Sequence, residues 1–113
     1  MARVLLVEDE KSLRELIAEA LTDCGHDPTV ATNGVEAIDF LAKQAFEVVI
    51  SDISMPEGVS GIDLADYIRE AKLPSKVILV SGHSRAQLPA LPEQTYFLPK
   101  PYRIQQLLAL ITQ

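Results

Sequence analysis

Residues 47–52 of the chain read EVVISD, and residues 53–56, which follow directly, read ISMP. The first stretch is a short run of apolar, β-forming residues that ends in one carboxylate, Asp52, and such a run is typical of a buried strand. Pro56 then breaks the extended stretch. Asp52 is therefore predicted to lie at the end of a strand, on an edge of a sheet that a reactant can reach.

A second pair of acidic residues follows an earlier run of the same kind. Residues 3–7 are mostly apolar, and Glu8 and Asp9 come directly after them. If the two strands lie side by side and parallel, three carboxylates meet at one edge of the sheet, where each close pair would repel by about 4 kcal/mol at an intermediate dielectric. A divalent cation such as Mg2+, which prefers oxygen ligands, would offset this repulsion. The sequence thus predicts a cation site at this edge.

Short apolar runs alternate with helical periodicity along the whole chain. Strands are expected at 3–7, 28–31, 47–52, 76–80 and 95–98, and helices at 11–24, 34–42, 62–71 and 104–111. Between the last two strands, Pro89 and Pro92 leave room for only a turn or two of the helix that the alternation requires. Strands joined through helices pair in parallel with right-handed crossovers and carry helices on both faces. The expected fold is an α/β domain of three layers.

Composition and charge narrow the class of protein. Of the 113 residues, 48% are hydrophobic, which suits one domain, and the net charge of -6 favours neither nucleic acid nor an anionic membrane as a partner. No signal peptide or membrane helix is recognisable, so the protein is expected to be soluble and cytoplasmic. Cys24, the only cysteine, falls with Leu16 on the apolar face of the helix expected at 11–24 and is predicted to be a small core residue.

Four of the expected strands carry polar residues at their carboxyl ends. In open α/β sheets, sites form beyond these ends, which here bear Glu8, Asp9, Asp52, Ser81 and Lys100. Such an edge suits phosphoryl transfer, whose loose transition state needs positioning and electrostatic support. Asp52 would act as the nucleophile and form an aspartyl phosphate. Ser81 and Lys100 would donate hydrogen bonds to the new phosphate oxygens.

The chain resembles the receiver domain of bacterial two-component response regulators over essentially its whole length. Four motifs carry the resemblance, each at a strand end and in the right order: Glu8-Asp9, Asp52 with Met55-Pro56, Ser81-Gly82 and Lys100-Pro101. It implies the flavodoxin-like, doubly wound sheet of five parallel strands in the order 2-1-3-4-5 with five helices, the fourth short or distorted. It also implies a stand-alone receiver over residues 1–113 with no effector domain. The long loop at 56–61 and the ending Lys100-Pro101-Tyr102 resemble the receivers of hybrid histidine kinases.

The resemblance also assigns roles at the cation site. Asp52 would accept a phosphoryl group from a phosphohistidine on a histidine kinase or a histidine phosphotransfer protein. Asp9 and Asp52 would bind Mg2+ or Mn2+ directly, and Glu8 would act mostly through water. The backbone carbonyl of Ser54 would complete the protein ligands. The domain would catalyse only its own phosphorylation and dephosphorylation.

The remaining roles concern the response to phosphorylation. Lys100 would pair with the phosphoryl oxygens, Ser81 would swing inward, and Phe97 would change rotamer with it, which makes a two-state switch that alters a protein-binding surface. A downstream protein target, rather than nucleic acid or a membrane, would read that surface. Ser54 and His83 are candidates for tuning the lifetime of the phosphoryl group. Phe97 is equally well explained as an ordinary core residue.

Three other functions compete with a phosphorylated receiver. A haloacid-dehalogenase-type phosphatase also forms an aspartyl phosphate at a strand end, but it requires an aspartate where this chain has Ser54. A flavodoxin-like flavin carrier would need a phosphate-binding loop where this chain has Glu8 and Asp9. A pseudo-receiver would keep the fold and bind proteins without being phosphorylated, and labelling of Asp52 separates it from the first hypothesis.

Overall fold

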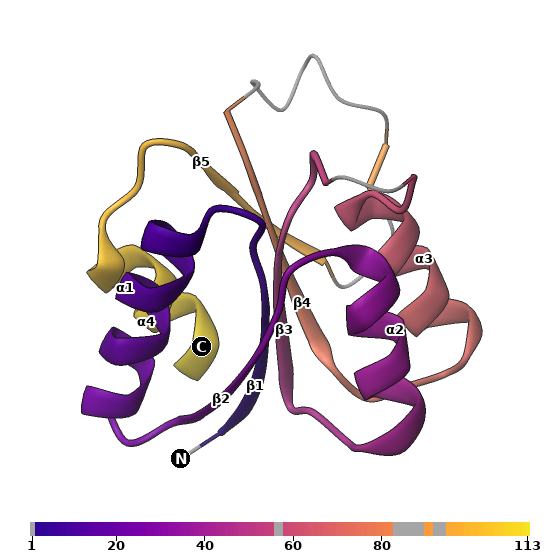
Figure 1. Ribbon diagram of the computed structural model, residues 1–113, viewed down its shortest axis with the longest axis horizontal. Helices are drawn as coiled ribbons and strands as arrows, with labels where there is room; N and C mark the ends of the chain where they lie inside the picture. Colours follow the sequence, from indigo (N-terminus) through magenta and orange to yellow (C-terminus); the bar gives the residue numbers. More distant parts are fainter. Residues whose placement is uncertain (1, 56–57, 83–89, 92–94) are drawn as a thin grey trace.

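The computed structural model of the protein describes residues 2–55, 58–82, 90–91 and 95–113, which include five strands and four helices (Figure 1). The strands are β1 (Arg3–Val7), β2 (Asp27–Ala31), β3 (Val48–Asp52), β4 (Lys76–Ser81) and β5 (Thr95–Pro99). The helices are α1 (Lys11–Asp23), α2 (Gly34–Lys43), α3 (Gly61–Glu70) and α4 (Ile104–Thr112). None of these helices has the length and apolar content needed to span a bilayer. The short helix expected around Pro89 and Pro92 falls outside the described residues.

The five strands form one parallel sheet in the order β2-β1-β3-β4-β5, which confirms the expected topology. The register aligns the carboxyl ends of the inner strands, because Val7 of β1 lies opposite Ser51 of β3, and Ser51 lies opposite Leu79 of β4. On the other side of β4, Ser81 lies opposite Pro99. The residues that follow β1, β3, β4 and β5 are therefore brought to a common edge.

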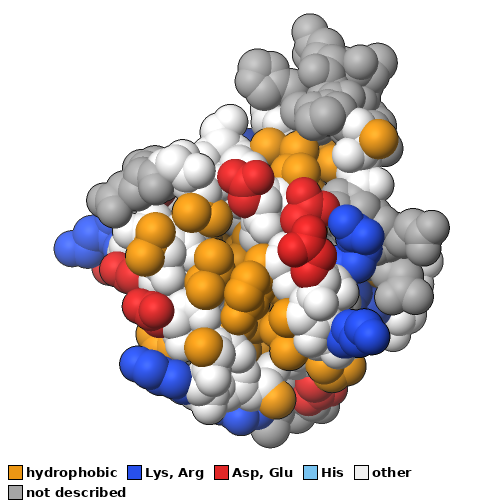
Figure 2. Space-filling view, turned by 90° about the vertical axis from the view of Figure 1, so that its right-hand side faces the viewer, with side chains coloured by type: hydrophobic (Ala, Val, Ile, Leu, Met, Phe, Trp, Pro, Cys, Tyr) orange, Lys and Arg blue, Asp and Glu red, His pale blue; other side chains and the backbone are white. Residues whose placement is uncertain are grey.

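The sheet separates two apolar cores, each covered by a pair of helices (Figure 1). Alternate residues of a strand point to opposite faces, so Leu6 and Ile50 pack in the cluster under α1 and α4 whereas Leu5 and Val49 pack in the cluster under α2 and α3. Figure 2 shows hydrophobic side chains along the middle of the molecule on the side of α2 and α3, with acidic side chains beside them. Leu5, Leu6, Val49 and Ile50 are all buried.

Local signals in the sequence set the ends of three helices. The side chain of Asn33 accepts a hydrogen bond from the Glu36 N–H at 2.8 Å and caps α2. At the start of α3, Ser60 and Asp63 form a reciprocal capping box. Gly25 follows α1 with φ of 86°, the left-handed conformation that glycine adopts without strain.

Two residues that the sequence predicts on the buried face of α1 are exposed. The prediction that Cys24 is a core residue is wrong, because α1 ends at Asp23 and Cys24 is an exposed residue at the helix end. Leu16 is 57% exposed, while Ile17 and Leu21 supply the buried contacts. The helix therefore buries a narrower face than its apolar spacing predicts, and it leaves a leucine on the surface.

Candidate functional site

The three predicted acidic residues meet at the carboxyl edge of the sheet. Glu8 and Asp9 follow β1, Asp52 ends β3, and these strands are adjacent and parallel. One carboxylate oxygen of each residue lies within 4.8 Å of those of the other two. Glu8 is buried and Asp9 is exposed, so the cluster is open to solvent on one side.

Lys100 completes the cluster from the loop after β5. Its ammonium group donates a hydrogen bond to Oδ2 of Asp52 at 2.6 Å, and only 11% of the Asp52 side chain is exposed. The N–H of Lys100 also donates to the carbonyl of Ser81 at 2.7 Å, which ties the end of β4 to this loop. The four residues predicted to hold the cation and the phosphoryl charge are thus side by side.

The electrostatics of the cluster show an excess of negative charge. Burial raises the pKa of Glu8 above its ordinary value of 4.5, and the charge of Asp52 raises it further, while the Glu10 N–H and Lys100 oppose the rise only in part. Burial also acts to lower the pKa of Lys100, but its hydrogen bond to Asp52 and the charges of Asp52 and Glu8 outweigh this, so the net pKa shift is upward. Ionisation of Glu8 is therefore unfavourable in the folded protein, and the charge of Lys100 offsets this only in part.

The residues present fit a hard divalent cation. When Glu8, Asp9 and Asp52 are all ionised, the ammonium of Lys100 pairs with one of the three carboxylates, and the other two have no ion pair within the described residues. Carboxylate oxygens are the ligands that Mg2+ and Mn2+ prefer. A divalent cation would therefore balance both the charge and the coordination chemistry of this edge.

Gly61 supports Asp52 from behind, a role that sequence reasoning missed. A Cβ atom at Gly61 would lie 2.5 Å from the carbonyl oxygen of Asp52 and 2.9 Å from Cα of Ile53. The N–H of Gly61 donates to the Ile53 carbonyl at 2.9 Å, and the Ile53 N–H donates to Val80 at 2.9 Å. The first turn of α3 can thus pack directly on the backbone of the candidate nucleophile only because position 61 lacks a side chain.

The other predicted site residues differ in their burial and in their place in the fold. Ser81 is buried, 2% exposed, at the end of β4. Ser54 is exposed, two residues after Asp52. Phe97 lies on β5, half-buried against the core under α2 and α3. His83 lies outside the described residues.

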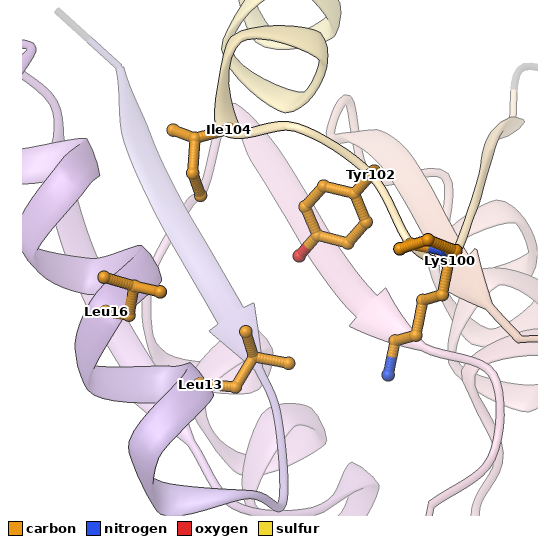
Figure 3. Close-up of a pocket in the computed structure, with 6 residues that line it drawn as sticks. Leu13, Leu16, Lys100, Tyr102 and Ile104 are labelled. Carbon is orange, nitrogen blue, oxygen red and sulfur yellow. The ribbon is translucent and has the colours of Figure 1, made fainter.

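An apolar hollow of about 490 Å³ adjoins Lys100 between α1 and the start of α4. Figure 3 shows Leu13 and Leu16 on α1 facing Tyr102 and Ile104 across it, with Lys100 at one end. Burial raises the pKa of the Tyr102 hydroxyl, and the nearby charge of Glu8 adds to the rise. The exposed Leu16 therefore belongs to an apolar surface that reaches the acidic cluster.

A parallel sheet in the order 2-1-3-4-5 with three carboxylates and a lysine at its carboxyl edge defines a receiver-type signalling domain. The chain belongs to the response regulator receiver domain family, whose sequence model matches residues 4–112. This membership decides against the phosphatase and the flavin carrier. The chain is therefore a receiver domain of the kind found in two-component systems, a class of signalling switch.

Individual relatives agree with this assignment. The response regulator protein FleR of Pseudomonas aeruginosa is 34% identical over 99% of the chain, which spans only 24% of the length of FleR. The response regulator receiver protein CpdR of Brucella abortus is 31% identical, and the match covers 95% of the chain and 91% of CpdR. The matched region is thus the receiver part of a larger regulator in the first case and nearly all of the relative in the second.

Two solved structures of one response regulator have a fold similar to that of this chain. TrrA of Thermotoga maritima, in complex with Mg2+ and BeF, is 33% identical with a TM-score of 0.87, and the match covers 99% of the chain and 97% of TrrA. A second structure holds TrrA in complex with the histidine kinase ThkA, with 32% identity, a TM-score of 0.86 and the same coverage.

Proposed function

We propose that this receiver is phosphorylated on Asp52 by a phosphohistidine of a histidine kinase or a histidine phosphotransfer protein. The observation that carries the proposal is the 2.6 Å contact between Lys100 and Asp52 beside two further carboxylates at an open edge of the sheet. An oxygen of Asp52 attacks the phosphorus atom, and the bond from phosphorus to the imidazole nitrogen breaks. The nitrogen keeps the bonding electron pair, and a proton already on the other ring nitrogen of the phosphohistidine makes the departing histidine neutral. The product on this chain is an aspartyl phosphate.

Mg2+, or Mn2+ in its place, is the proposed cofactor. Asp9, Asp52 and the backbone carbonyl of Ser54 would hold it directly, and Glu8 would act through water. When bound, the cation neutralises charge that develops on the transferring phosphoryl group. The uncompensated charge of the acidic cluster and the Mg2+–BeF complex of TrrA support this assignment.

Phosphorylation would act on the protein surface through Lys100 and Ser81. The ammonium of Lys100, already beside Asp52, would turn to the new phosphoryl oxygens. Ser81 is joined to the Lys100 loop through its carbonyl, so its hydroxyl group would follow, and Phe97 would repack on β5. The domain would thus catalyse only its own phosphorylation and dephosphorylation, and Ser54 and His83 would tune how long the phosphoryl group persists.

The partners of this proposal are proteins. The phosphohistidine donor must bring its imidazole to the open side of Asp52, and the apolar hollow beside Lys100, with Leu16 57% exposed, offers it a docking surface. The complex of TrrA with ThkA supports a histidine kinase as the donor. A downstream protein, rather than nucleic acid or a membrane, would read the phosphorylated surface. We place the domain in the cytoplasm, where a reducing environment suits its exposed Cys24.

Labelling with acetyl phosphate tests the proposal. With Mg2+ present, the intact mass of the protein is expected to rise by one phosphoryl group, and Asp52→Asn should abolish the gain. Asp39→Asn, an exposed position on α2, is the matched control and should be labelled normally. Chelation of the metal should slow labelling of the wild type. Absence of labelling, or labelling that survives Asp52→Asn, would favour the pseudo-receiver.

A further inference from the structure

Arg14 holds the backbone of the turn that carries the acidic pair. This residue lies one turn into α1, and its Nη1 donates a hydrogen bond to the carbonyl of Glu8 at 2.9 Å. The same nitrogen lies 3.5 Å from the carbonyl of Asp9, a weaker contact. The guanidinium group therefore bonds to the main chain of two of the three clustered acidic residues.

The choice of partner atoms is informative. An arginine that reaches an acidic turn would commonly form an ion pair with one of its carboxylates. Within the described part of the chain, Arg14 forms no ion pair with Glu8, Asp9 or Asp52, and its bonds go to carbonyl oxygens instead. Arg14 thus restrains the turn and leaves the carboxylates to other ligands.

Other hydrogen bonds hold the same turn from its remaining sides. The N–H of Glu8 donates to the carbonyl of Ala31 at 3.1 Å, which ties the turn to β2. The Glu8 carboxylate accepts from the N–H of Glu10 at 3.1 Å, which orients that side chain at the start of α1. With Nη1 of Arg14 on the Glu8 carbonyl, the peptide between Glu8 and Asp9 is held from both strand and helix.

We infer that Arg14 is a positioning residue for the cation site: it fixes the Glu8–Asp9 turn so that both carboxylates are in place before Mg2+ binds. The inference rests on the proposed function, because it presupposes that the acidic cluster binds Mg2+. Loss of a group that orients metal ligands typically weakens metal binding by about 10- to 100-fold. Loss of a positive charge near the site, by contrast, should strengthen the binding of a cation. The two effects have opposite signs, so an experiment can separate them.

Three variants make the separation. Arg14→Gln removes both the charge and the guanidinium fork, Arg14→Lys keeps the charge with a simpler donor, and Lys11→Gln removes a charge from an exposed site on the same helix. The Mg2+ dissociation constant of each is measured by NMR titration of the ¹⁵N-labelled protein with MgCl2, without a phosphodonor and well below the melting temperature. Labelling by acetyl phosphate is then followed as a function of Mg2+ concentration.

Arg14→Gln is expected to raise the Mg2+ dissociation constant by about tenfold, and its labelling rate should approach that of the wild type at saturating Mg2+. Arg14→Lys should fall between this variant and the wild type, and Lys11→Gln should bind Mg2+ as tightly as the wild type or more tightly. Arg14→Gln that binds Mg2+ as well as the wild type overturns the inference. If Arg14→Gln does not fold, wild-type affinity in Arg14→Lys overturns it instead. If the wild type binds no Mg2+, the proposed metal site itself is wrong, and this result is distinct from a failure of the inference about Arg14.

Discussion

The ammonium group of Lys100 lies 2.6 Å from Oδ2 of Asp52, although the two residues are 48 positions apart in the sequence. The pair joins the loop after β5 to the end of β3, and both side chains are largely withdrawn from solvent, with 31% and 11% exposed. A contact of this kind matters chiefly because removal of one partner leaves the other charge unpaired. It also couples the candidate phosphoacceptor to the loop that would report its phosphorylation.

Lys100→Ala should therefore destabilise the metal-free protein by about 1–2 kcal/mol at neutral pH, less than a fully buried pair would lose because Lys100 is partly solvated. Mg2+ should restore much of this loss, since it supplies the missing positive charge. Thermal unfolding with and without MgCl2 measures both effects. Lys43→Ala, an exposed control in the last turn of α2, should lose less stability and should not be restored by MgCl2.

The same variant should separate phosphorylation from the structural response. Acetyl phosphate should still label Asp52 in Lys100→Ala. The changes in the NMR spectrum that follow labelling of the wild type should be lost, because the variant has no ammonium group to bind the phosphoryl oxygens. Spectral changes identical to those of the wild type would show that the role assigned to Lys100 is wrong.

Glu8 should make the metal-free protein less stable as the pH rises. Its pKa is raised on folding, so between 4.5 and the folded value the folded state binds a proton that the unfolded state has released. Stability therefore falls as the pH rises through this window and stays lower above it. Glu8→Gln should flatten that part of the profile and raise the melting temperature at pH 7 by a few degrees, about 1 kcal/mol.

Urea unfolding from pH 4 to 8 in the presence of a chelator measures the Glu8 effect. Glu15→Gln, on the exposed face of α1, is the control for the loss of one negative charge. With saturating Mg2+ the advantage of Glu8→Gln should shrink or reverse. An unchanged slope between wild type and Glu8→Gln would argue against the burial cost assigned to this carboxyl.

Gly61→Ala should disturb Asp52 itself. The added Cβ would meet the Asp52 carbonyl oxygen at 2.5 Å, and backbone atoms cannot move aside as a flexible side chain would. We expect a loss of roughly 2–3 kcal/mol in stability and slower labelling of Asp52 at every Mg2+ concentration. Gly82→Ala is the control, because a Cβ there has no neighbour within 4 Å in the described part of the chain. Equal effects of the two substitutions would contradict the close approach.

Lys76 should stabilise the end of α4 independently of the acidic site. Its ammonium donates to the carbonyls of Leu110 at 2.9 Å, Ile111 at 3.3 Å and Gln113 at 2.7 Å, and it lies 5.3 Å from the ring centre of Tyr96. Lys76→Gln should cost about 1–2 kcal/mol and speed hydrogen exchange of the α4 amides, as mass spectrometry can measure. Exchange in α1 should remain as in the wild type, and a uniform increase would contradict a local role.

Much of the candidate site could be predicted from sequence because its parts follow strands. Apolar runs that end in Glu8, Asp9, Asp52 and Ser81 mark strand ends, and parallel pairing brings such ends to one edge whatever the helices between them contain. This reasoning did not identify Arg14 or Gly61. A single arginine on a helix and a glycine after a capping serine carry no pattern of their own, since their roles depend on which carbonyl oxygens lie opposite them.

The burial of α1 shows the same limit. Spacing predicted that Leu16 and Cys24 would be in the core, yet packing against the sheet buries Ile17 and Leu21 and leaves the other two exposed. Periodicity defines an apolar side of a helix, but the width of the contact depends on how closely the helix approaches the sheet and on where its last turn ends.

By itself, the sequence determined the class of fold, the strand order through its family resemblance, and the placement of Glu8, Asp9, Asp52 and Lys100 at one edge, because local periodicity and chain direction are sufficient for these. Only the tertiary structure decided that Lys100 pairs with Asp52 before any phosphoryl group arrives, that Glu8 is buried enough to resist ionisation, and that Gly61 and Arg14 hold the backbone of the acidic residues. Distances, burial and charge balance arise from contacts between segments far apart in the chain, and no local pattern encodes them.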